Sequence, residues 1–429
     1  MKLTLPCCAR PLSGAVEVPG DKSLAHRAML FASLAEGESE VRNYPDSGVT
    51  RAMRGALESL GVPSSLEAGV LRVKGNGFRP FPNAGATGYC GNSATTIRLM
   101  AGAVAGTGSS ATLDGSAGLR RRPMNRVADP LRAMGAEIAT DDGRAPLVFS
   151  AAGRLKPVDY AVPVASAQVL SCLQIAALGA SGASRFTVPG PVRDHTARML
   201  GSMGAEISSE GFVSTVRPLA RPLRSLHATL PGDISSATFL FAAAAIVPGS
   251  RITVTGIGVN PTRTGILDVL ESMGAVVSLA NARDEMGEPV ADVTVAAAPL
   301  KAVEIKGDLV VRSIDEFPAI AAVAAFAEGV TVVREAKELR YKESDRIAAI
   351  VTQLRALGAE VDEFDDGFAV HGGTLTGGTA QANGDHRLAM SMALCGLRAP
   401  VSVEGAEILN ESFPSFVPSL VALGVPEVC

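Results

Sequence analysis

One short pattern, L-x-x-[LM]-G-[AV], occurs six times along the 429-residue chain and constrains its fold more than any other feature. The copies place Gly61, Gly135, Gly204, Gly274, Gly358 and Gly424 at intervals of 66 to 84 residues. Each copy ends an apolar-periodic helix with a glycine at the C′ position, where a left-handed backbone costs little, and a β-rich stretch follows. A single corner of this kind is common. Six at near-regular spacing predict six related α/β units.

Three units in each half of the chain indicate two similar domains. The stretch SLHATLPGD at 225–233 carries turn residues between apolar segments, which favours a boundary near 225–232. A cleft between two such domains is the default place for a ligand.

The composition narrows the class of protein further. Apolar residues make up 47% of the chain but aromatic residues only 4%, so the cores must be packed from alanine and aliphatic side chains. The net charge of −4 excludes a general nucleic-acid or anionic-membrane surface. The six cysteines have no metal-ligand spacing, and no apolar run is long enough for a signal sequence or a membrane span. We therefore expect a cytoplasmic protein with reduced thiols and no metal.

The stretch GDKSLAHRAML at 20–30 places a lysine, a serine and an arginine at the start of an apolar helix. A P-loop would need G-x-x-x-x-G-K-[ST], and here Asp21 separates Gly20 from Lys22. Asp21 can cap the helix, whose N-terminus carries partial positive charge. This corner predicts a site for an anion that is not a nucleotide phosphate.

Five further stretches repeat this arrangement of polar residues at a helix start. One capped helix with a solvated charge has a purely structural explanation, but several that converge would form a site for a compact, multiply charged small molecule. Asp315 and Glu343 lie among cations and provide candidate acids and bases. The stretches contain Ser93 with Arg98, Ser166 with Gln168, Asp315 with Glu316, Asp385 with His386 and Arg387, and a helix expected over 339–350 with Lys342 and Arg346 on one face.

The chain resembles the enolpyruvyl transferases, and among them the branch that acts on shikimate 3-phosphate. The resemblance rests on motifs in order along the chain: PGDKSLAHRA, GNSATTIRLMAG, LRRRPM, ASAQV, RDHTARML, NPTRTGIL, IDEFP, ELRYKESDRI, DHRLAM and SFPSF. It implies a two-domain inside-out α/β barrel made of six βαβαββ repeats, three per domain. It further implies that residues 1–19 join 228–429 in one domain, that 20–227 form the inserted domain, and that the active site lies in the cleft between them.

The resemblance also implies a reaction, in which the enolpyruvyl group of phosphoenolpyruvate moves to the 5-hydroxyl of shikimate 3-phosphate and phosphate leaves. No metal or organic cofactor is implied, and we expect a monomer whose partners are these two small molecules. By motif, Lys22, Asp315 and Glu343 would be catalytic. Shikimate 3-phosphate would bind Lys22, Ser23, Arg27, Ser166, Gln168, Arg193, Asp315 and Lys342, and phosphoenolpyruvate would bind Lys22, Asn92, Ala94, Arg122, Gln168, Arg346 and Arg387.

Several positions depart from the family pattern. Ala94 stands where many relatives have glycine, which predicts weak inhibition by glyphosate, a longer mimic of phosphoenolpyruvate. Gly48 replaces a usual acid, Val192 a usual hydroxyl residue, and Glu411 a lysine that some relatives carry. A lost hydroxyl contact to phosphate costs on the order of 1–3 kcal/mol. These changes put the identity of the acceptor in question.

Two other interpretations of the sequence remain open. The chain could transfer the enolpyruvyl group to another acceptor in a specialised pathway, or it could be a catalytically silent binding relative. The cell-wall branch, which acts on a nucleotide sugar, is disfavoured because the stretch TLDGSAG at 112–118 lacks the reactive cysteine of that branch. Retention of Lys22, Asp315, Glu343 and Arg346 argues against a silent binder, which would not need the acids.

Overall fold

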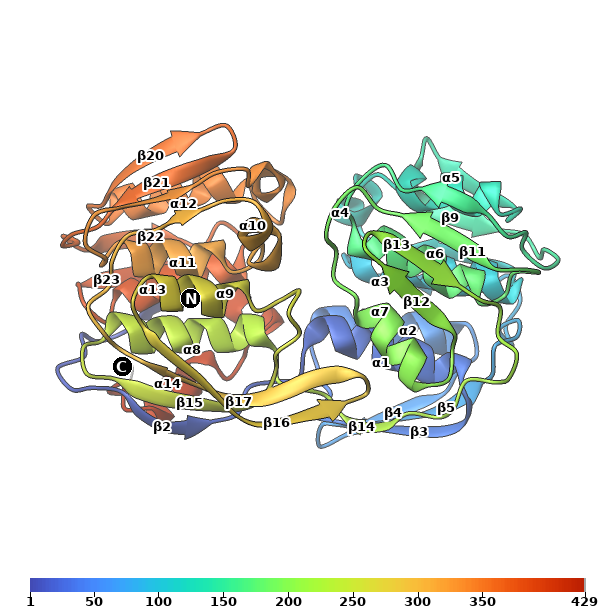
Figure 1. Cartoon of the computed structure of the whole chain (residues 1–429), viewed down its shortest axis with the longest axis horizontal. Coiled ribbons are helices and arrows are strands. Elements are labelled where there is room, and N and C mark those ends of the chain that lie inside the picture. Colours follow the sequence, from blue (N-terminus) through green and yellow to red (C-terminus); the bar gives the residue numbers. More distant parts are fainter. Residues whose placement is uncertain (428–429) are drawn as a thin grey trace. The chain divides into compact units, whose positions relative to one another are not determined.

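The computed structural model describes residues 1–427, so Cys429, one of the six cysteines, lies outside the described part of the chain. The chain divides into two compact units (Figure 1). Unit 2 comprises Gly20–Leu230 together with the short segment Asp284–Glu288, and unit 1 comprises the rest. Each unit has an apolar core of its own.

Unit 2 contains three four-stranded sheets within the described residues. The sheets, in strand order, are β14 (His227–Thr229), β3 (Glu36–Arg42), β5 (Val70–Asn76) and β4 (Ser64–Glu67); β6 (Thr87–Tyr89), β7 (Ala111–Asp114), β9 (Arg144–Phe149) and β8 (Ile138–Asp141); and β10 (Asp159–Ala161), β11 (Ser184–Thr187), β13 (Val213–Val216) and β12 (Ile207–Glu210).

Unit 1 also contains three sheets among the residues that the structure describes. They are β16 (Val276–Glu285), β17 (Glu288–Ala296), β15 (Arg251–Gly258) and β2 (Ser13–Val16); β18 (Glu304–Ile305), β19 (Val330–Val333), β21 (Gly367–His371) and β20 (Glu360–Phe364); and β1 (Lys2–Thr4), β23 (Val401–Glu404) and β22 (Gly378–Gln381).

The six sheets share one pairing pattern, in which a parallel pair is extended by an antiparallel strand. The parallel pairs are β14 with β3, β6 with β7, β10 with β11, β2 with β15, β18 with β19, and β22 with β23. The strands that extend them are β5, β9, β13, β17, β21 and β1. The recurrent sequence pattern therefore corresponds to a recurrent sheet.

At the two main crossings between the units, the last strand before the crossing pairs with a strand that is distant in sequence. β2 comes shortly before unit 2 begins but pairs with β15 of unit 1. β14 comes at the end of unit 2 and pairs with β3 at its beginning. Because of this pairing, residues 228–230 belong to unit 2, and the second crossing falls after Leu230 instead of after residue 227 as the sequence analysis expected. The turn 284–288, also grouped with unit 2, was expected in the other domain.

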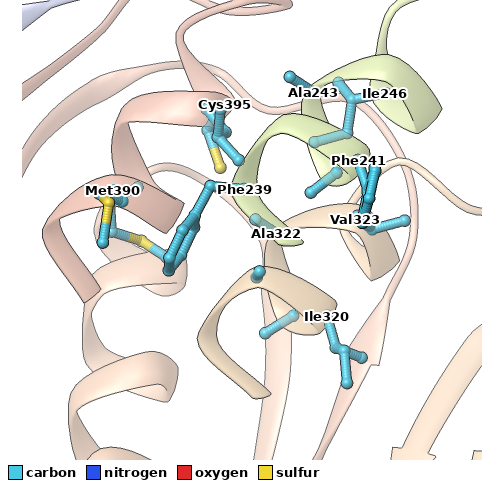
Figure 2. Close-up of a cluster of buried hydrophobic side chains, with 14 of the residues drawn as sticks. Phe239, Phe241, Ala243, Ile246, Ile320, Ala322, Val323, Met390 and Cys395 are labelled. Carbon is cyan, nitrogen blue, oxygen red and sulfur yellow. The ribbon is translucent and has the colours of Figure 1, made fainter. Parts of the chain in front are cut away.

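Among the described residues, three helices in each unit are buried along most of their length. α8 (Ile234–Ile246) is buried along its whole length, and it packs against α11 (Phe317–Ala324) and α13 (His386–Cys395). Figure 2 shows Phe239 and Phe241 of α8 beside Val323 of α11 and Met390 of α13. In unit 2 the buried helices are α1 (Lys22–Leu34), α3 (Ala94–Thr107) and α6 (Ala167–Ala177). Helices inside and sheets outside make each unit an inside-out α/β barrel.

The remaining helices lie closer to the surface. They are α2 (Gly48–Ser59), α4 (Ala117–Arg120), α5 (Asn125–Ala133) and α7 (His195–Ser202) in unit 2, and α9 (Gly265–Ser272), α10 (Asp308–Arg312), α12 (Arg346–Ala356), α14 (Phe416–Ala422), η1 (Lys337–Tyr341) and η2 (Ala406–Glu411) in unit 1. Among residues 1–427, no helix combines the length and the apolar character that a membrane crossing requires.

Close packing of the buried helices explains the low aromatic content. A Cβ at Gly102 of α3 would lie 2.2 Å from the carbonyl oxygen of Cys172 in α6. One turn later, a Cβ at Gly106 would lie 3.0 Å from the Cα of Ala176. Small residues therefore let the two backbones touch, where larger side chains would force them apart.

The six repeat glycines end their helices in the same way. Their φ angles are 93°, 94°, 104°, 105°, 90° and 107°, in chain order. At the first copy, the Val62 amide donates to the Leu57 carbonyl at 3.0 Å and the Gly61 amide donates to the Glu58 carbonyl at 2.9 Å. Equivalent pairs occur at the other five copies. These bonds form Schellman motifs, which confirm the expected left-handed glycine at each corner.

Gly135→Ala should destabilise the protein by about 1–2 kcal/mol, because an L side chain is strained at the positive φ of this corner while the space around it is open. Gly55→Ala is the matched control, since Gly55 is exposed within α2 and a Cβ there also meets nothing within 4 Å. It should stabilise the protein by about 0.5–1 kcal/mol. Urea unfolding of both variants measures the two changes in stability. If both variants were stabilised, or both destabilised, the assignment of strain to the positive φ of Gly135 would be contradicted.

Candidate active site

Five of the six buried helices begin at a polar residue whose side chain caps the helix, and α11 follows Glu316 without a side-chain cap. Asp21 Oδ1 accepts from the Leu24 amide at 2.9 Å, and Ser93 Oγ accepts from the Thr96 amide at 3.1 Å. Ser166 caps α6, Asp233 caps α8, and Asp385 caps α13. The caps of α1, α3, α6 and α13 confirm the helix starts expected from the sequence. They also place the positive end of each helix dipole beside the candidate site residues.

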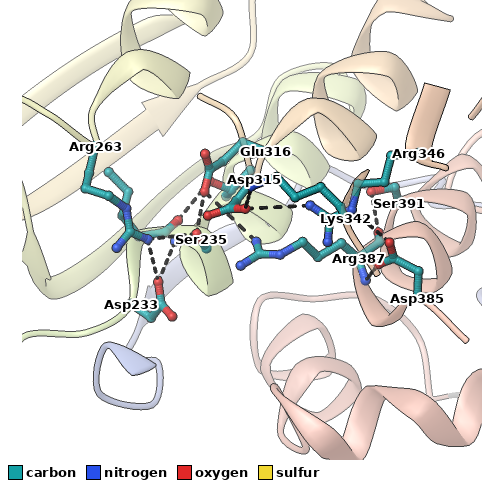
Figure 3. Close-up of polar contacts among 12 residues, drawn as sticks. Asp233, Ser235, Arg263, Asp315, Glu316, Lys342, Arg346, Asp385, Arg387 and Ser391 are labelled. Atoms are coloured by element: carbon teal, nitrogen blue, oxygen red, sulfur yellow. Dashed lines mark hydrogen bonds and ion pairs between the residues drawn. The ribbon is translucent and has the colours of Figure 1, made fainter. Parts of the chain in front are cut away.

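In unit 1, three carboxylates from three motifs contact the Arg346 guanidinium, and two of them, Asp315 and Asp385, are labelled in Figure 3. Arg346 Nε donates to Asp385 Oδ2 at 2.8 Å, and Nη2 donates to Glu343 Oε2 at 2.8 Å. Asp315 Oδ1 lies 3.6 Å from Arg346 Nη1 and 3.6 Å from Lys342 Nζ. The structure thus brings together the two candidate acids and two of the candidate cations that the sequence singled out.

The ion pair between Arg346 and Asp385 is almost completely buried, with side-chain exposures of 1% and 0%. Burial by itself would raise the pKa of Asp385, but the charge and hydrogen bond of Arg346 hold it below its usual range. The pKa of Arg346 is raised in turn, because the charges of Glu343, Asp385 and Asp315 outweigh its desolvation. Both groups are charged in the folded protein.

Arg387 lies beside a second buried polar cluster in unit 1. Its Nη1 is 4.0 Å from Oε1 of Glu316, a residue with no exposed side-chain surface. The same Glu316 oxygen accepts a short hydrogen bond from Ser235 Oγ, which in turn accepts from Arg263 Nη2 at 2.9 Å. Buried charges require such partners. The cluster therefore fixes the segment that carries Asp315.

The expected helix over 339–350 begins later than the sequence suggested. Residues 337–341 form η1, Lys342 has an extended backbone, and α12 starts at Arg346 with Asp345 as its cap. Asp345 Oδ1 accepts from the Ala348 amide at 3.1 Å, which ends the extended segment. Lys342 and Arg346 therefore do not share a helix face. They meet at Asp315 because the loop turns the lysine back.

In unit 2, the buried Arg27 side chain donates hydrogen bonds to residues of three helices. Its Nε donates to Thr196 Oγ1 at 2.8 Å, its Nη2 to Ser171 Oγ at 2.9 Å, and its Nη1 to the Ser23 carbonyl at 2.9 Å. These partners lie on α7, α6 and α1. Lys22 and Ser23, at the first turn of α1, are only partly buried.

Gln168 connects the starts of α3 and α6. Its Oε1 accepts from Arg98 Nη1 at 2.6 Å, and its Nε2 donates to Thr95 Oγ1 at 2.9 Å. Arg98 Nη2 also donates to the Pro123 carbonyl at 3.3 Å, next to the partly buried Arg122. Asn92 Oδ1 accepts from Ser116 Oγ at 3.0 Å. Ser166 caps α6, and Arg193 precedes the cap of α7.

The candidate residues divide between the units, and each set is gathered at helix starts. Unit 2 carries Lys22, Ser23, Arg27, Asn92, Ala94, Arg122, Ser166, Gln168 and Arg193, while unit 1 carries Asp315, Lys342, Glu343, Arg346 and Arg387.

Sequence reasoning assigned no role to several residues that hold these sets together. Asp385 was noted only as a polar residue at a helix start, although its DHR motif could have indicated a partner for Arg346. His26 lies inside the apolar helix α1 and contacts Ser93 Oγ of α3, and no spacing rule identifies such a contact. Glu288 bonds His195 Nδ1 at 2.8 Å from 93 residues away.

Asp194, His195 and Glu288 bring three potential metal-ligating atoms within 4.8 Å of one another in unit 2. The His195 ring nitrogen Nδ1 already bonds Glu288, and Arg198 Nε donates to Asp194 Oδ2 at 2.7 Å. The Arg198 Nη1 group also donates to the Gly287 carbonyl at 3.2 Å. These bonds explain why the three residues lie together, because they attach the segment 284–288 to α7.

Inside-out α/β units with cations and acids at the starts of their buried helices define a class of transferases. The family model of EPSP synthase (3-phosphoshikimate 1-carboxyvinyltransferase) matches residues 8–420. The chain belongs to this family.

Individual relatives agree closely in length and sequence. A 3-phosphoshikimate 1-carboxyvinyltransferase of Geobacter metallireducens is 45% identical over 416 residues, covering 96% of this chain and 97% of the relative. One of Synechococcus sp. strain RCC307 is 46% identical over 425 residues, with the same coverage. The solved EPSP synthase of Acinetobacter baumannii matches with a TM-score of 0.92 at 35% identity, covering 100% of this chain and 99% of that one.

Asp385→Asn should lower the free energy of unfolding at pH 7 by about 2–4 kcal/mol, because it leaves the buried Arg346 charge with only Asp315 and Glu343. The amide oxygen still caps α13, while the amide nitrogen removes both the charge and the acceptor of the bonds from Arg346 Nε and Ser344 Oγ. Because the folded pKa of Asp385 is depressed, its contribution is present above the ordinary aspartate pKa of about 3.9 and is lost as the pH falls through the folded pKa.

Urea unfolding at pH 7 and at about pH 3 tests this expectation. The matched control is Asp362→Asn, since Asp362 pairs with His371 at the surface with 56% of its side chain exposed. The control should hardly change stability. If the difference in the free energy of unfolding between wild type and Asp385→Asn were larger at about pH 3 than at pH 7, the depressed pKa of Asp385 would be contradicted.

Proposed function

We propose that this protein transfers the enolpyruvyl group of phosphoenolpyruvate to the 5-hydroxyl of shikimate 3-phosphate and releases phosphate, as a step of aromatic amino acid biosynthesis. The observation that carries the proposal is the position of Asp315, 3.6 Å from both Lys342 and Arg346, in a chain of the EPSP synthase family. A carboxylate beside two cations remains ionised and can accept a proton from a hydroxyl.

In the proposed mechanism, the acceptor oxygen adds to C2 of phosphoenolpyruvate while a proton is delivered to the C3 methylene. The resulting tetrahedral intermediate then loses phosphate from C2 and a proton from the methyl group, which restores the double bond. Asp315 takes the hydroxyl proton, and Glu343 with Lys22 transfers the proton at carbon. The steps are proton transfers and the departure of phosphate, so the proposal requires no metal or organic cofactor.

Cations and helix starts supply the charge that two phosphorylated acids require. Glu343 is 42% exposed on its side chain and bonded to Arg346, which suits a group that must exchange protons beside an anion. In this proposal shikimate 3-phosphate binds Lys22, Ser23, Arg27, Ser166, Gln168, Arg193, Asp315 and Lys342. Phosphoenolpyruvate binds Lys22, Asn92, Ala94, Arg122, Gln168, Arg346 and Arg387.

The proposal therefore draws substrate-binding residues from both units, and we propose that the protein is a cytoplasmic monomer. Three positions depart from the family pattern. Gly48 is the first residue of α2, whose start is held by the reciprocal capping of Ser47 and Thr50 without an acid. Val192 is partly buried and Glu411 is exposed at the end of η2.

Phosphate release from purified protein tests the acceptor. Release should require both phosphoenolpyruvate and shikimate 3-phosphate, and Asp315→Asn should lower kcat by about a hundredfold or more because it removes the proton acceptor. Asp362→Asn, a surface acid of unit 1, is the control and should retain wild-type kcat. Absence of release with shikimate 3-phosphate would favour another acceptor or a binding role, and would make Gly48, Val192 and Glu411 the positions to revert.

We further propose that the protein is insensitive to glyphosate because of Ala94. This residue opens α3 directly after the cap Ser93, it is 6% exposed, and it packs with the core of unit 2. A methyl group in so closely packed a helix start excludes a ligand that extends into its volume, whereas the shorter phosphoenolpyruvate does not need that space.

Ala94→Gly should tighten glyphosate inhibition by about ten- to a hundredfold, which corresponds to relief of the 1–3 kcal/mol typical of overpacking. The KM for phosphoenolpyruvate should change much less. Ala94→Ser keeps the bulk and is expected to remain insensitive. Similar micromolar inhibition constants for wild type and Ala94→Gly would show that residue 94 does not determine the response.

A further inference from the structure

A buried histidine connects two helix starts in unit 2. His26 lies in the second turn of α1 with 1% of its surface exposed, and Ser93, the cap of α3, is 5% exposed. The His26 Nδ1 atom lies 2.7 Å from the Lys22 carbonyl oxygen, and the Nε2 atom lies 3.3 Å from Ser93 Oγ. One imidazole ring thus touches the backbone of Lys22 and the residue between Asn92 and Ala94.

The partners of the ring determine which nitrogen carries the proton. A carbonyl oxygen can only accept, so Nδ1 must hold the hydrogen and donate it to Lys22, and Nε2 must accept. Ser93 Oγ already accepts from the Thr96 amide at 3.1 Å and from Thr96 Oγ1 at 2.9 Å, and its own hydrogen is available for Nε2. Each hydrogen bond in the series from the Lys22 carbonyl through His26 and Ser93 to Thr96 then has one donor and one acceptor.

The network requires a neutral ring. Burial, with the nearby charges of Lys22 and Arg27, lowers the pKa of His26 to about 4, against smaller opposing effects of the Lys22 carbonyl bond and Asp21. At neutral pH the ring is uncharged and can accept from Ser93. A protonated ring would carry a second hydrogen and would face the Ser93 hydroxyl as a donor.

We propose that His26 is a positioning residue that fixes the start of α3, with Asn92 and Ala94, relative to the start of α1, with Lys22 and Ser23, through its hydrogen bond with Ser93. The consequence for binding rests on the proposed function, in which both helix starts hold phosphoenolpyruvate. A hydrogen bond between buried side chains sets a helix start more firmly than apolar contact does, because it is directional.

A double-mutant cycle tests the link. His26→Asn keeps a donor near the Nδ1 position for the Lys22 carbonyl but is too short to reach Ser93, and Ser93→Ala removes the other partner. Each should raise the KM for phosphoenolpyruvate by about three- to tenfold, the range expected for one hydrogen bond, with kcat within about twofold. The double variant should resemble Ser93→Ala, because Ser93→Ala already removes the contact with His26 together with the cap of α3.

His26→Gln serves as the conservative variant, since its side-chain oxygen can accept from Ser93 near the position of Nε2. It should restore the KM to within about twofold of wild type. Multiplication of the two single effects in the double variant would overturn the proposal. So would loss of stability in urea without any change in KM, which would mark His26 as a structural residue only.

Nitrogen NMR of the imidazole provides a readout that does not require turnover. In the full-length wild-type protein His26 should carry its proton on Nδ1 and should not titrate between about pH 5.5 and 8. Ser93→Ala should shift the Nε2 resonance, and a ring protonated on Nε2 would refute the link. If wild type released no phosphate while Ser93→Ala still shifted Nε2, the link would stand and the proposed function would fall.

Discussion

A helix that is buried on every side can meet water and polar ligands only at its ends. Each unit of this protein encloses three such helices behind three sheets, and the interior is closed by alanine and glycine contacts such as Gly102 against Cys172. The first turn of each helix still has unpaired amide groups, which must be satisfied by a cap or a ligand. Polar chemistry is therefore confined to the helix starts, where Asp21, Ser93 and Asp385 lie.

The same confinement explains why the charged residues of each unit are so strongly coupled. In unit 1, Arg346 is shared by three carboxylates, and removal of any one changes the environment of the others. In unit 2, Arg27 is shared by three helix starts. A substitution at such a hub alters several contacts at once, so its effects on stability and on binding are not additive.

Much of this organisation could be predicted from the sequence because it repeats or follows local rules. The six glycine corners depend on backbone geometry that the local pattern encodes, and the caps depend on one side chain near its own helix. Asp315 and Glu343 were expected beside cations because their own stretches of sequence are rich in cations, and the resemblance implied their catalytic roles. The expected helix over 339–350 was wrong at its start, because Asp345 caps α12 and residues 342–345 lie in neither η1 nor α12.

The remaining features depend on contacts between segments with no common pattern. His26 and Ser93 are 67 residues apart, and His195 and Glu288 are 93 residues apart. In both pairs the histidine lies in a motif that the sequence analysis quoted. Ser93 was expected at a helix start and Glu288 had no assigned role, and neither signal indicates a contact with a histidine. The pairing of β14 with β3 shifted the boundary between the units for the same reason, since a three-residue strand can join whichever sheet offers a free edge.

The exchanged strands also impose an order on folding during synthesis. All the strands of unit 2 lie within residues 36–229, so its sheets can close once β14 has left the ribosome. The first strands made belong elsewhere. β2 must wait for β15 at residues 251–258, and β1 must wait for β23 at residues 401–404. Leu3 and Leu5, which belong to the core of unit 1, therefore lack the strand that pairs beside them until residues 401–404 have been made.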